Sequence, residues 1–312
     1  IPSPSELGDP DVSQMWLGEL GGPEARTVLA RQYQAYGPWL EHVDGPVLDV
    51  GCGAGEWLSF LGGLGKVAVG IDNNAREIER CRRANLNAHF AEAFEWLAEH
   101  LPPGSVVGAD GAVLSLAAAR TLQEKLAARD IALRSDIDLL DDVWQPRPGL
   151  PAAAAYEHPA PYAPISRRDK LATIRAEMRK AGAQAHFVST LDDIAWITNL
   201  RGADVPYNPV FAAHLLVTGE AAALFVGDGK VAPSLREKLA EEGITLAPYG
   251  EAAAALAALP SRSSVLLDPR RITLAFRQAV PETVRVVEAI NPSTLAKSRK
   301  SDAEIAFVRQ AM

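Results

Sequence analysis

Short apolar runs alternate with amphipathic stretches along the first half of the chain. The apolar runs lie at residues 46–50, 67–71, 88–90, 105–109 and 131–134. The stretches between them have helical periodicity, at residues 56–64, 75–85, 92–101 and 114–129. Apolar runs of this length suit strands that are buried on both faces of a parallel sheet. Their alternation with helices is typical of a doubly wound α/β fold.

We expect these strands to share one mostly parallel sheet, a partial Rossmann-like sheet. In the alternative arrangement, residues 1–95 form a separate half-sheet, which would be unstable because its exposed edge strands need to be covered. A weaker helical pattern at residues 24–40 precedes the first strand.

A proline-rich stretch divides the pattern in two. Six prolines fall between Trp144 and Pro164, a density that excludes a helix and indicates a linker. A second α/β pattern follows, with strands predicted at 185–189, 212–218, 222–226 and 265–268, and helices at 167–182, 191–199, 233–242 and 252–259. The first of these helices places Leu171, Ile174 and Met178 on one face.

The end of the chain carries a capping box, Ser301-Asp-Ala-Glu304, which predicts the start of a helix. The sequence reaches Met312 eight residues later, so we expect a further domain that is cut short. The predicted organisation is a half-fold at 1–97, a second piece at 98–150 that can share its sheet, a linker at 151–165, an α/β domain at 166–296 and a truncated domain start at 297–312.

Composition and charge narrow the function classes. Hydrophobic residues make up 48% of the chain and charged residues 22%, an ordinary balance for a globular protein. The net charge of −8 argues against general binding to nucleic acid or to an anionic membrane surface, because such binding needs concentrated Lys and Arg. The sequence contains no run of 18 apolar residues and therefore predicts no membrane span.

The cysteines and the first residues bear on the cellular setting. Cys52 and Cys81 form neither a disulfide framework nor a CxxC metal pair, which favours a reducing, cytoplasmic environment. The chain begins without Met and without a signal pattern, so we expect a processed or cut N-terminus. The oligomeric state stays open, a homo-oligomer included.

A glycine-rich turn, Gly51-x-Gly53-x-Gly55, follows the first apolar run. Glycines let the backbone pass close to a ligand, and the helix that follows offers free N–H groups there. Asp72 ends the second apolar run, where it can accept hydrogen bonds from a ribose diol. Such turns also occur for structural reasons alone, and Asp49 and Asp72 can equally serve as helix caps or turn residues.

The string Val47-Leu-Asp-Val-Gly-Cys-Gly-Ala-Gly55 resembles motif I of class I S-adenosylmethionine-dependent methyltransferases. Its glycine spacing differs from the Gly-x-Gly-x-x-Gly motif of NAD enzymes. The resemblance implies that S-adenosylmethionine is the cofactor and that Gly51, Gly53 and Gly55 border its methionine portion.

The same resemblance implies roles for acidic residues. Asp49 would organise the loop and the amino group of the cofactor, and Asp72 would hold the ribose hydroxyls. Glu92, with Ala93, falls where that family often contacts adenine. The resemblance covers residues 25–97 and stops before the strands that carry the methyl-acceptor side in that family. It therefore implies a cofactor site without a recognisable acceptor site.

From residue 96 onward the chain resembles a second family, the three-domain Xaa-Pro aminopeptidases (aminopeptidase P), in their non-catalytic creatinase/prolidase-type N-terminal domains. The strings that carry this resemblance are Trp96–Asp110, Asp141–Trp144 with Arg147-Pro148, Leu191–Trp196, Asn199–Gly202, Asp204–Phe211 and Lys297–Glu304. That family hydrolyses the bond before proline with two divalent metals, usually Mn²⁺, held in a third domain. Because we expect that domain to be absent, the resemblance implies neither Mn²⁺ binding nor peptidase activity for this chain.

The remaining polar residues do not form a metal or nucleophile motif. The six histidines are dispersed, with no His-x-x-x-His pair, at positions 42, 89, 100, 158, 186 and 214. Asp192 and Asp193 are adjacent, so their side chains diverge on a helix and favour its N-terminal dipole instead. Ser115 and Ser189 lack the sequence context of a nucleophile elbow.

Arg201 and Tyr207 lie in a loop bounded by glycine and proline, where binding residues often occur. In the aminopeptidase family this region approaches the catalytic cleft. Because we expect the third domain to be absent, we expect no direct role in binding or catalysis for these two residues.

Three functions remain open. In the main hypothesis the chain is a composite or truncated protein that binds S-adenosylmethionine, a methyltransferase at best, with unknown catalytic residues. The alternative is a non-catalytic N-terminal fragment of a metal-dependent Xaa-Pro aminopeptidase that serves assembly or substrate access. A third hypothesis is a non-catalytic fusion. The expected partner is a small-molecule cofactor, with no nucleic acid and no membrane.

Overall fold

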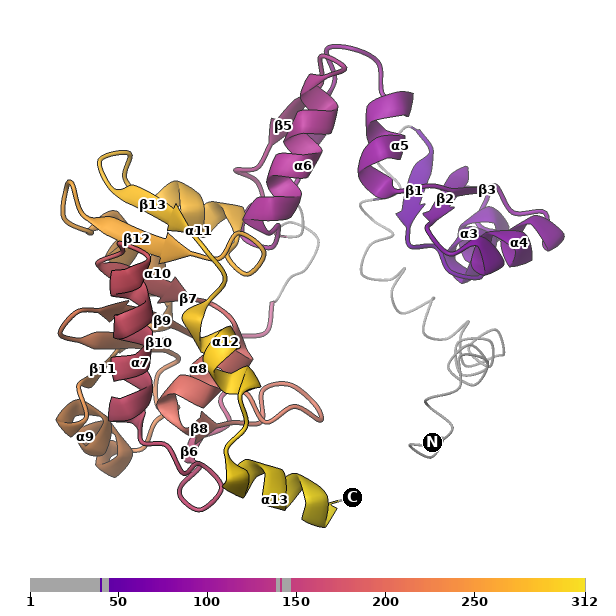
Figure 1. Cartoon of the computed structure of the whole chain (residues 1–312). Coiled ribbons are helices and arrows are strands. Elements are labelled where there is room, and N and C mark those ends of the chain that lie inside the picture. Colours follow the sequence, from indigo (N-terminus) through magenta and orange to yellow (C-terminus); the bar gives the residue numbers. More distant parts are fainter. Residues whose placement is uncertain (1–39, 41–44, 139–140, 142–146, 312) are drawn as a thin grey trace. The chain divides into compact units, whose positions relative to one another are not determined.

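The computed structural model describes residues 40, 45–138, 141 and 147–311, and the chain divides into two compact units (Figure 1). The first unit comprises the described residues up to Ala109 together with Thr121–Arg147. The second comprises Asp110–Arg120 and the residues from Pro148 onward. The predicted helix at 24–40 and the 141–144 string lie outside the described residues, apart from Leu40 and Asp141.

A three-stranded parallel sheet opens the first unit. Its strands are β1 (Val47–Val50), β2 (Ala68–Asp72) and β3 (Ala88–Phe90), in that spatial order. Helices α3 (Glu56–Gly63) and α4 (Ala75–Arg83) connect them, and α5 (Ala93–His100) follows. The core beneath the sheet is small and consists of Cys52, Leu58, Ile78, Cys81 and Ala88.

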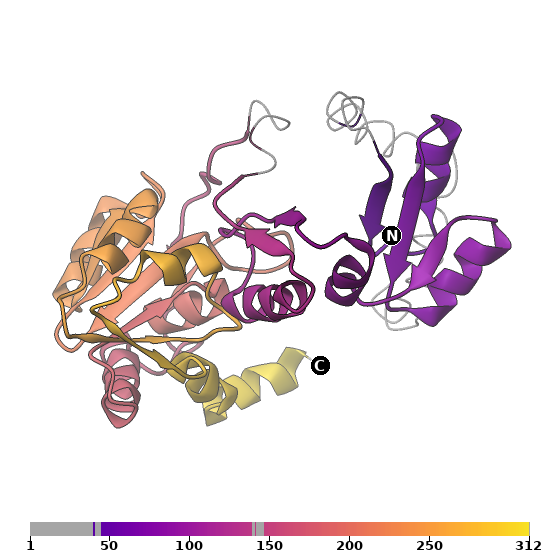
Figure 2. The ribbon, with the colours of Figure 1, turned by 90° about the horizontal axis from the view of Figure 1, so that it is seen from above.

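The prediction that five strands share one sheet is wrong. Strands β4 (Val106–Gly108) and β5 (Ala132–Arg134) pair with each other in a separate two-stranded parallel sheet, connected by α6 (Leu116–Ala127) (Figure 2). A central strand of a parallel sheet is buried on both faces. Residues of β4 and β5 instead alternate between exposed and half-buried, and Val106 is 63% exposed. The exposure of β4 and β5 is thus too high for central strands, and their short apolar runs in the sequence do not show which sheet they join.

A six-stranded sheet forms the centre of the second unit. Its strands are β7 (Ala185–Val188), β9 (Ala213–Thr218), β10 (Ala222–Val226), β11 (Ile244–Pro248), β12 (Ser264–Leu267) and β13 (Arg285–Glu288). The spatial order is β11-β10-β9-β7-β12-β13, in which β9 runs antiparallel to both neighbours and the other pairs are parallel. The chain is therefore mixed α/β with parallel sheets, as the sequence predicts.

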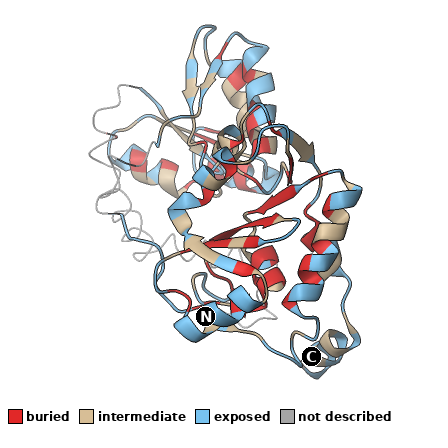
Figure 3. Cartoon of the chain, turned by 90° about the vertical axis from the view of Figure 1, so that its left-hand side faces the viewer, coloured by how far each residue is buried: buried red, intermediate tan, exposed pale blue. Residues whose placement is uncertain are grey.

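Helices cover both faces of this sheet. One apolar cluster joins it to α7 (Arg167–Lys180), α8 (Leu191–Thr198) and α9 (Pro233–Glu241), and the other to α10 (Ala252–Ala257) and α11 (Leu274–Ala279). Along β9, Leu215 and Val217 enter the first cluster and Leu216 enters the second, as the two-residue period of a strand requires. Figure 3 shows the strands and the sheet-facing sides of the helices buried.

The sequence pattern located the central strands and missed the edges. The edge strands β11 and β13 were not predicted, because β11 ends in Pro248 and β13 has only two apolar residues, Val286 and Val287. The short pair β6 (Tyr156–Glu157) and β8 (Leu200–Arg201) and helix α12 (Pro292–Ser298) were missed as well. Helix α13 (Asp302–Ala311) begins at the predicted capping box, where Ser301 and Glu304 exchange hydrogen bonds.

None of the helices among the described residues has the length and apolar character that a membrane span requires.

Candidate functional site

The acidic and glycine residues predicted for cofactor binding meet at one edge of the three-stranded sheet. β1 leads into Gly51, β2 ends at Asp72, and Glu92 follows β3 by two residues. Because the three strands are parallel, their carboxyl ends lie at the same edge. In open α/β sheets this edge is where ligands bind. The tertiary structure therefore brings the predicted residues together.

The three glycines of the turn all have left-handed backbone conformations. The φ angles are +74° at Gly51, +53° at Gly53 and +89° at Gly55, values that residues with a side chain rarely adopt. A Cβ atom at Gly55 would also lie 2.4 Å from Cδ1 of Leu86 and 3.0 Å from Sγ of Cys81. At Gly51 and Gly53 a Cβ would meet nothing within 4 Å, so this part of the turn has open space beside it.

Asp72 binds the turn directly. Its Oδ2 accepts a hydrogen bond from the backbone N–H of Gly53 at 3.0 Å, and its Oδ1 accepts one from the N–H of Asn74 at 2.7 Å. Asn74 in turn caps α4 by accepting a hydrogen bond from the N–H of Arg76. Asp72 thus serves as a turn residue, and its predicted role toward a ribose stays a prediction.

Glu92 is the N-cap of α5. Its Oε2 accepts hydrogen bonds from the N–H groups of Phe94 at 3.0 Å and Glu95 at 3.2 Å. This contact satisfies two of the free donors at the start of the helix. Glu92 therefore serves as a helix cap, and its predicted contact with adenine stays a prediction.

Asp49 is half-buried within β1, where its backbone pairs with β2, and its carboxylate forms no hydrogen bond to another described residue. Burial raises the pKa of its carboxyl group, and the negative charges of Glu56 and Asp72 raise it further. Three acidic side chains therefore converge near the turn. Such a site favours a cationic group in whatever ligand it holds.

Two free thiols pack beneath the turn. Sγ of Cys81 lies 3.3 Å from the carbonyl oxygen of Gly53, to which it donates a weak hydrogen bond, and Cys52 is buried beside it. Burial raises the pKa of Cys52 to about 12, with the Cys81 thiol as a further cause, so the thiol stays protonated. No pattern in the sequence indicates that these two residues, 29 positions apart, would support the glycine turn from below.

In the second unit, Asp192 and Asp193 have different environments. Asp193 is 1% exposed, and its Oδ2 accepts hydrogen bonds from Thr190, Asn291 and Thr294. Lys297 forms ion pairs with both carboxylates, at 2.8 Å from Oδ1 of Asp193. The sequence indicates only a negative charge at the start of α8. In the structure Asp193 also joins α8 to α12, through Thr294 and Lys297.

The pKa of Asp193 reflects that environment. Burial would raise it, but Lys297 and the hydrogen bonds from Thr190 and Asn291 hold the pKa of this carboxyl group below its ordinary value. The group therefore stays ionised inside the fold.

The loop residues Arg201 and Tyr207 do not converge on a site in the second unit. Nη1 of Arg201 donates hydrogen bonds to the carbonyl oxygens of Ala195 at 2.9 Å and Leu200 at 2.8 Å. Tyr207 is fully exposed and has a φ of +62°. The side chain of Arg201 thus stabilises the backbone of its own segment.

Two histidines lie in the interior of the second unit. Nδ1 of His186 donates to the carbonyl oxygen of Leu266 at 3.0 Å, and Nδ1 of His214 lies 3.1 Å from Oγ of Ser189. Burial lowers the pKa of both imidazoles to about 4. Among the described residues, no group of three or more His, Cys, Asp or Glu side chains could hold a metal ion. His42 lies outside the described residues.

Comparison with known proteins supports the second resemblance. Residues 146–304 match a family model described as Creatinase/Prolidase N-terminal domain. Aminopeptidase P2 of Arabidopsis thaliana is 36% identical over 194 residues, which make up 61% of this chain and 27% of that protein. The chain spans between 27 and 38% of the length of the most similar curated relatives.

Solved structures show the fold over a similar range. The X-prolyl aminopeptidase of Caenorhabditis elegans, described as a cytosolic enzyme with a di-nuclear active site, aligns with a TM-score of 0.64 and 24% identity over 70% of this chain and 37% of its own. A SAM-dependent methyltransferase of Archaeoglobus fulgidus aligns with a TM-score of only 0.27 and 24% identity, over 39% of this chain and 55% of its own, and no assignment rests on that match.

Proposed function

Because the chain belongs to the creatinase/prolidase N-terminal domain family, we propose that it supplies the non-catalytic N-terminal part of an Xaa-Pro aminopeptidase. In this role it shapes access to the peptide substrate or assembles with the catalytic part, and the metal-dependent hydrolysis occurs elsewhere. The observation that carries the proposal is the family match over residues 146–304, which coincides with the six-stranded sheet domain.

The segment that enters this domain is held firmly against it by a buried lysine. Nζ of Lys230 forms an ion pair with Asp204 at 2.8 Å, and both side chains are only 2% exposed. The same ammonium donates to the carbonyl oxygens of Pro151 at 2.6 Å and Ala153 at 3.0 Å. A buried ammonium with three acceptors holds the incoming segment on the domain, because a loss of any acceptor would leave a buried charge unpaired.

A chimera tests this proposal. The segment of Arabidopsis thaliana aminopeptidase P2 that matches this chain would be replaced by the corresponding residues of this chain, and hydrolysis of an Xaa-Pro peptide would be measured with added Mn²⁺. We expect the chimera to hydrolyse the peptide, whereas this chain alone does not. A chimera that is folded by circular dichroism but has no activity would overturn the proposal. A second chimera carries Lys230→Met in addition. It should be less active than the first, because residues 151–153 lose the ammonium that holds them.

A second candidate function is binding of S-adenosylmethionine at the edge of the three-stranded sheet. The observation that favours it is the left-handed turn at Gly51, Gly53 and Gly55, with open space beside the first two and a convergence of carboxylates around Asp49. Such negative potential suits a ligand that carries ammonium and sulfonium groups. Binding alone would not make the chain a methyltransferase, since its sequence carries no recognisable acceptor site.

Calorimetric titration with S-adenosylmethionine and S-adenosylhomocysteine tests this candidate. The chain should be compared with a Gly53→Val, Asp72→Ala double variant. Saturable binding that the double variant loses would support the site. Absence of heat with both ligands, in a chain whose three-stranded sheet is shown to be folded by hydrogen exchange, would leave the glycine-rich turn as a structural feature only.

A further inference from the structure

A serine and a histidine form a hydrogen-bonded pair at the carboxyl edge of the six-stranded sheet. Ser189 directly follows β7, and His214 is the second residue of β9. The two strands are antiparallel, and the register that pairs Val188 with Leu215 continues to Ser189 and His214. Oγ of Ser189 lies 3.1 Å from Nδ1 of His214. This distance is within the reach of a nucleophile and its general base.

The pair lies where open α/β sheets bind their ligands. From β7 the chain continues to β9 on one side of that strand and later forms β12 on the other side, so the strand order reverses beside β7. Ligands bind at the carboxyl edge of such sheets, next to a reversal of this kind. Ser189 is half-buried at this edge, whereas His214 is 8% exposed. The serine is therefore the more accessible member of the pair.

The turn that carries Ser189 has the connectivity of a nucleophile elbow. The chain passes from β7 through Ser189 and Thr190 directly into α8. In hydrolases with such a strand–serine–helix turn, the backbone N–H after the serine stabilises the oxyanion. The turn here lacks the glycines of the usual elbow motif, so the sequence alone does not indicate a nucleophile at this position.

The start of α8 can receive a negative charge. The side chain of Thr190 does not cap the helix, since its hydroxyl contacts Asp193 and Asn291 instead. The first N–H groups of a helix have no partner within the helix and favour an anion. Asp193 and its neighbour Asp192 both pair with Lys297, which reduces the repulsion that an oxyanion would meet there.

Three aromatic rings hold the imidazole of His214. The ring centroids of Phe187, Tyr249 and Phe276 lie 5.7, 4.7 and 4.6 Å from that of His214. This packing restrains the orientation of the imidazole, a task that a third polar side chain performs in catalytic triads. Burial lowers the pKa of His214 to about 4, so the imidazole is neutral at pH 7 and one of its nitrogens can accept a proton.

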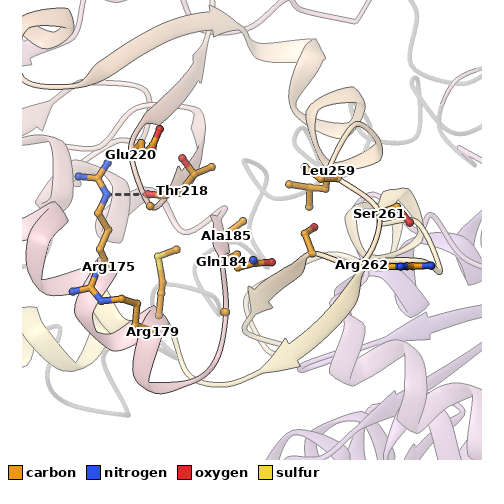
Figure 4. Close-up of a pocket in the computed structure, with 14 residues that line it drawn as sticks. Arg175, Arg179, Gln184, Ala185, Thr218, Glu220, Leu259, Ser261 and Arg262 are labelled. Atoms are coloured by element: carbon orange, nitrogen blue, oxygen red, sulfur yellow. Dashed lines mark hydrogen bonds between the residues drawn. The ribbon is translucent and has the colours of Figure 1, made fainter.

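The opposite edge of the sheet provides a contrast. A cleft lies there between the end of α7 and the loop from Leu259 to Ser263 (Figure 4). Its lining includes Ser261 and Ser263 but no histidine. Arg175 in this lining is engaged with the sheet, because its Nε donates a hydrogen bond to the carbonyl oxygen of Thr218 at 2.8 Å. The serines of this cleft therefore serve as controls for the serine at the carboxyl edge.

We propose that Ser189 and His214 form a catalytic dyad that hydrolyses short carboxylic esters. Oγ of Ser189 attacks the carbonyl carbon, its proton passes to Nδ1 of His214, and the N–H groups at the start of α8 hold the oxyanion. The ester C–O bond then breaks, and the imidazolium returns the proton to the leaving alcohol. Water attacks the acyl-serine with His214 as the base, which releases the acid and restores the serine. This activity is independent of metal-dependent hydrolysis and of the three-stranded sheet.

A fluorophosphonate tests for an activated serine. The full chain would be incubated with diisopropyl fluorophosphate, and peptide mass spectrometry would locate the adduct. Oγ bonds to phosphorus, the P–F bond breaks, and the proton that His214 takes up leaves with fluoride. We expect an adduct on Ser189 that Ser189→Ala abolishes and Ser261→Ala leaves unchanged. Absence of this adduct in a chain that is folded by circular dichroism would overturn the proposal.

Hydrolysis of p-nitrophenyl acetate tests the ester chemistry itself. We expect the chain to release nitrophenolate faster than Ser189→Ala does, by about a hundredfold, the size of a typical general-base contribution. Ser261→Ala should behave like the wild-type chain. Equal rates in wild type and Ser189→Ala would refute the ester hydrolysis.

His214→Gln separates a general base from a structural contact. This variant should slow the labelling of Ser189 by about a hundredfold, whereas His100→Gln, at an exposed position, should leave it unchanged. If His214→Gln does not fold, the pH dependence of wild-type labelling decides. With a pKa of about 4, His214 is neutral throughout the range from about pH 6 to pH 8, so labelling should be constant there. Equal labelling in His214→Gln, or a rise centred at pH 6.5, the ordinary pKa of histidine, would contradict the dyad.

Discussion

Oδ2 of Asp72 accepts a hydrogen bond from the backbone N–H of Gly53 at 3.0 Å, so the end of β2 holds the glycine-rich turn that follows β1. The same carboxylate accepts the N–H of Asn74 through its other oxygen. One side chain thus fixes the shape of the turn and the start of α4. The turn is formed before any ligand binds.

Asp72→Ala should therefore loosen the turn. Loss of two backbone hydrogen bonds to a charged acceptor is expected to destabilise this part of the fold by about 1–3 kcal/mol. Amide hydrogen exchange should show faster exchange at Gly53 and Asn74, and Asp72→Asn should retain part of the protection. The exposed neighbour Asn73→Ala is the matched control. Unchanged protection at Gly53 in the Asp72→Ala variant would contradict this role.

Two glycines of the turn should differ in their tolerance of a side chain. Gly51→Ala introduces only the cost of a left-handed conformation, about 1–2 kcal/mol. Gly55→Ala adds the overlap of its Cβ with Cδ1 of Leu86, 2.4 Å away, and should cost about 2–4 kcal/mol. Urea unfolding followed by peptide-level hydrogen exchange over α3 and α4 compares the two. Equal losses in the free energy of unfolding of the two variants would show that the side chain of Leu86 moves aside without a cost in stability.

The neighbours Asp192 and Asp193 provide a matched pair for the contact between α8 and α12. Asp193→Asn removes the charge of a carboxylate that is 1% exposed and should destabilise the second unit by about 3 kcal/mol, because this group holds Lys297 and three hydrogen-bond donors on α8 and α12. Asp192 is 60% exposed, so Asp192→Asn should cost about 0–1 kcal/mol although it pairs with the same lysine. Equilibrium unfolding in urea measures both, and a similar effect of the two variants would contradict the central role of Asp193.

Acid should remove the contribution of Asp193. Its folded-state pKa is lowered, so the stabilisation is complete above the unfolded-state pKa of about 3.9 and is lost as the pH falls through the lower folded-state pKa. We expect the wild-type chain to lose free energy of unfolding below about pH 4, and the Asp193→Asn variant to lose less over the same range. Urea titrations at a series of pH values give this comparison.

The buried histidines act in a higher pH window. The folded-state pKa of His186 is about 4, below its ordinary value of 6.5, because burial disfavours the imidazolium ion. The unfolded chain takes up this proton first as the pH falls, so stability should decrease between about pH 6.5 and pH 4, by about 1.4 kcal/mol for each unit of pKa difference. His186→Gln should reduce this slope, as should His214→Gln. Parallel slopes in wild type and variants would show that the imidazoles are protonated inside the fold.

The sequence by itself determined the fold class and the position of the central strands. Apolar runs such as 212–218 and 222–226 suit burial on both faces, and the glycine spacing at 51–55 predicts a tight turn between a strand and a helix. It also placed Asp72 at the end of the second strand, whereas the shared edge that brings it near Asp49 and Glu92 is seen only in the folded sheet. The second resemblance is confirmed by the creatinase/prolidase N-terminal family match over residues 146–304 and by the similarity to aminopeptidase P2, whereas the resemblance to methyltransferases stays a prediction.

Only the tertiary structure decided which strands pair and what each polar group contacts. The local pattern of β4 and β5 resembles that of β1–β3, so it does not show that they form a separate sheet. Which strands pair depends on how much of each face is buried in the folded protein. Asp72 and Asp193 look alike as residues near helix starts, yet one binds a turn and the other joins two helices. The hydrogen bond from Nε of Arg175 to the carbonyl oxygen of Thr218 joins segments that are 43 residues apart in the chain, and contacts of that kind arise only from the folded arrangement.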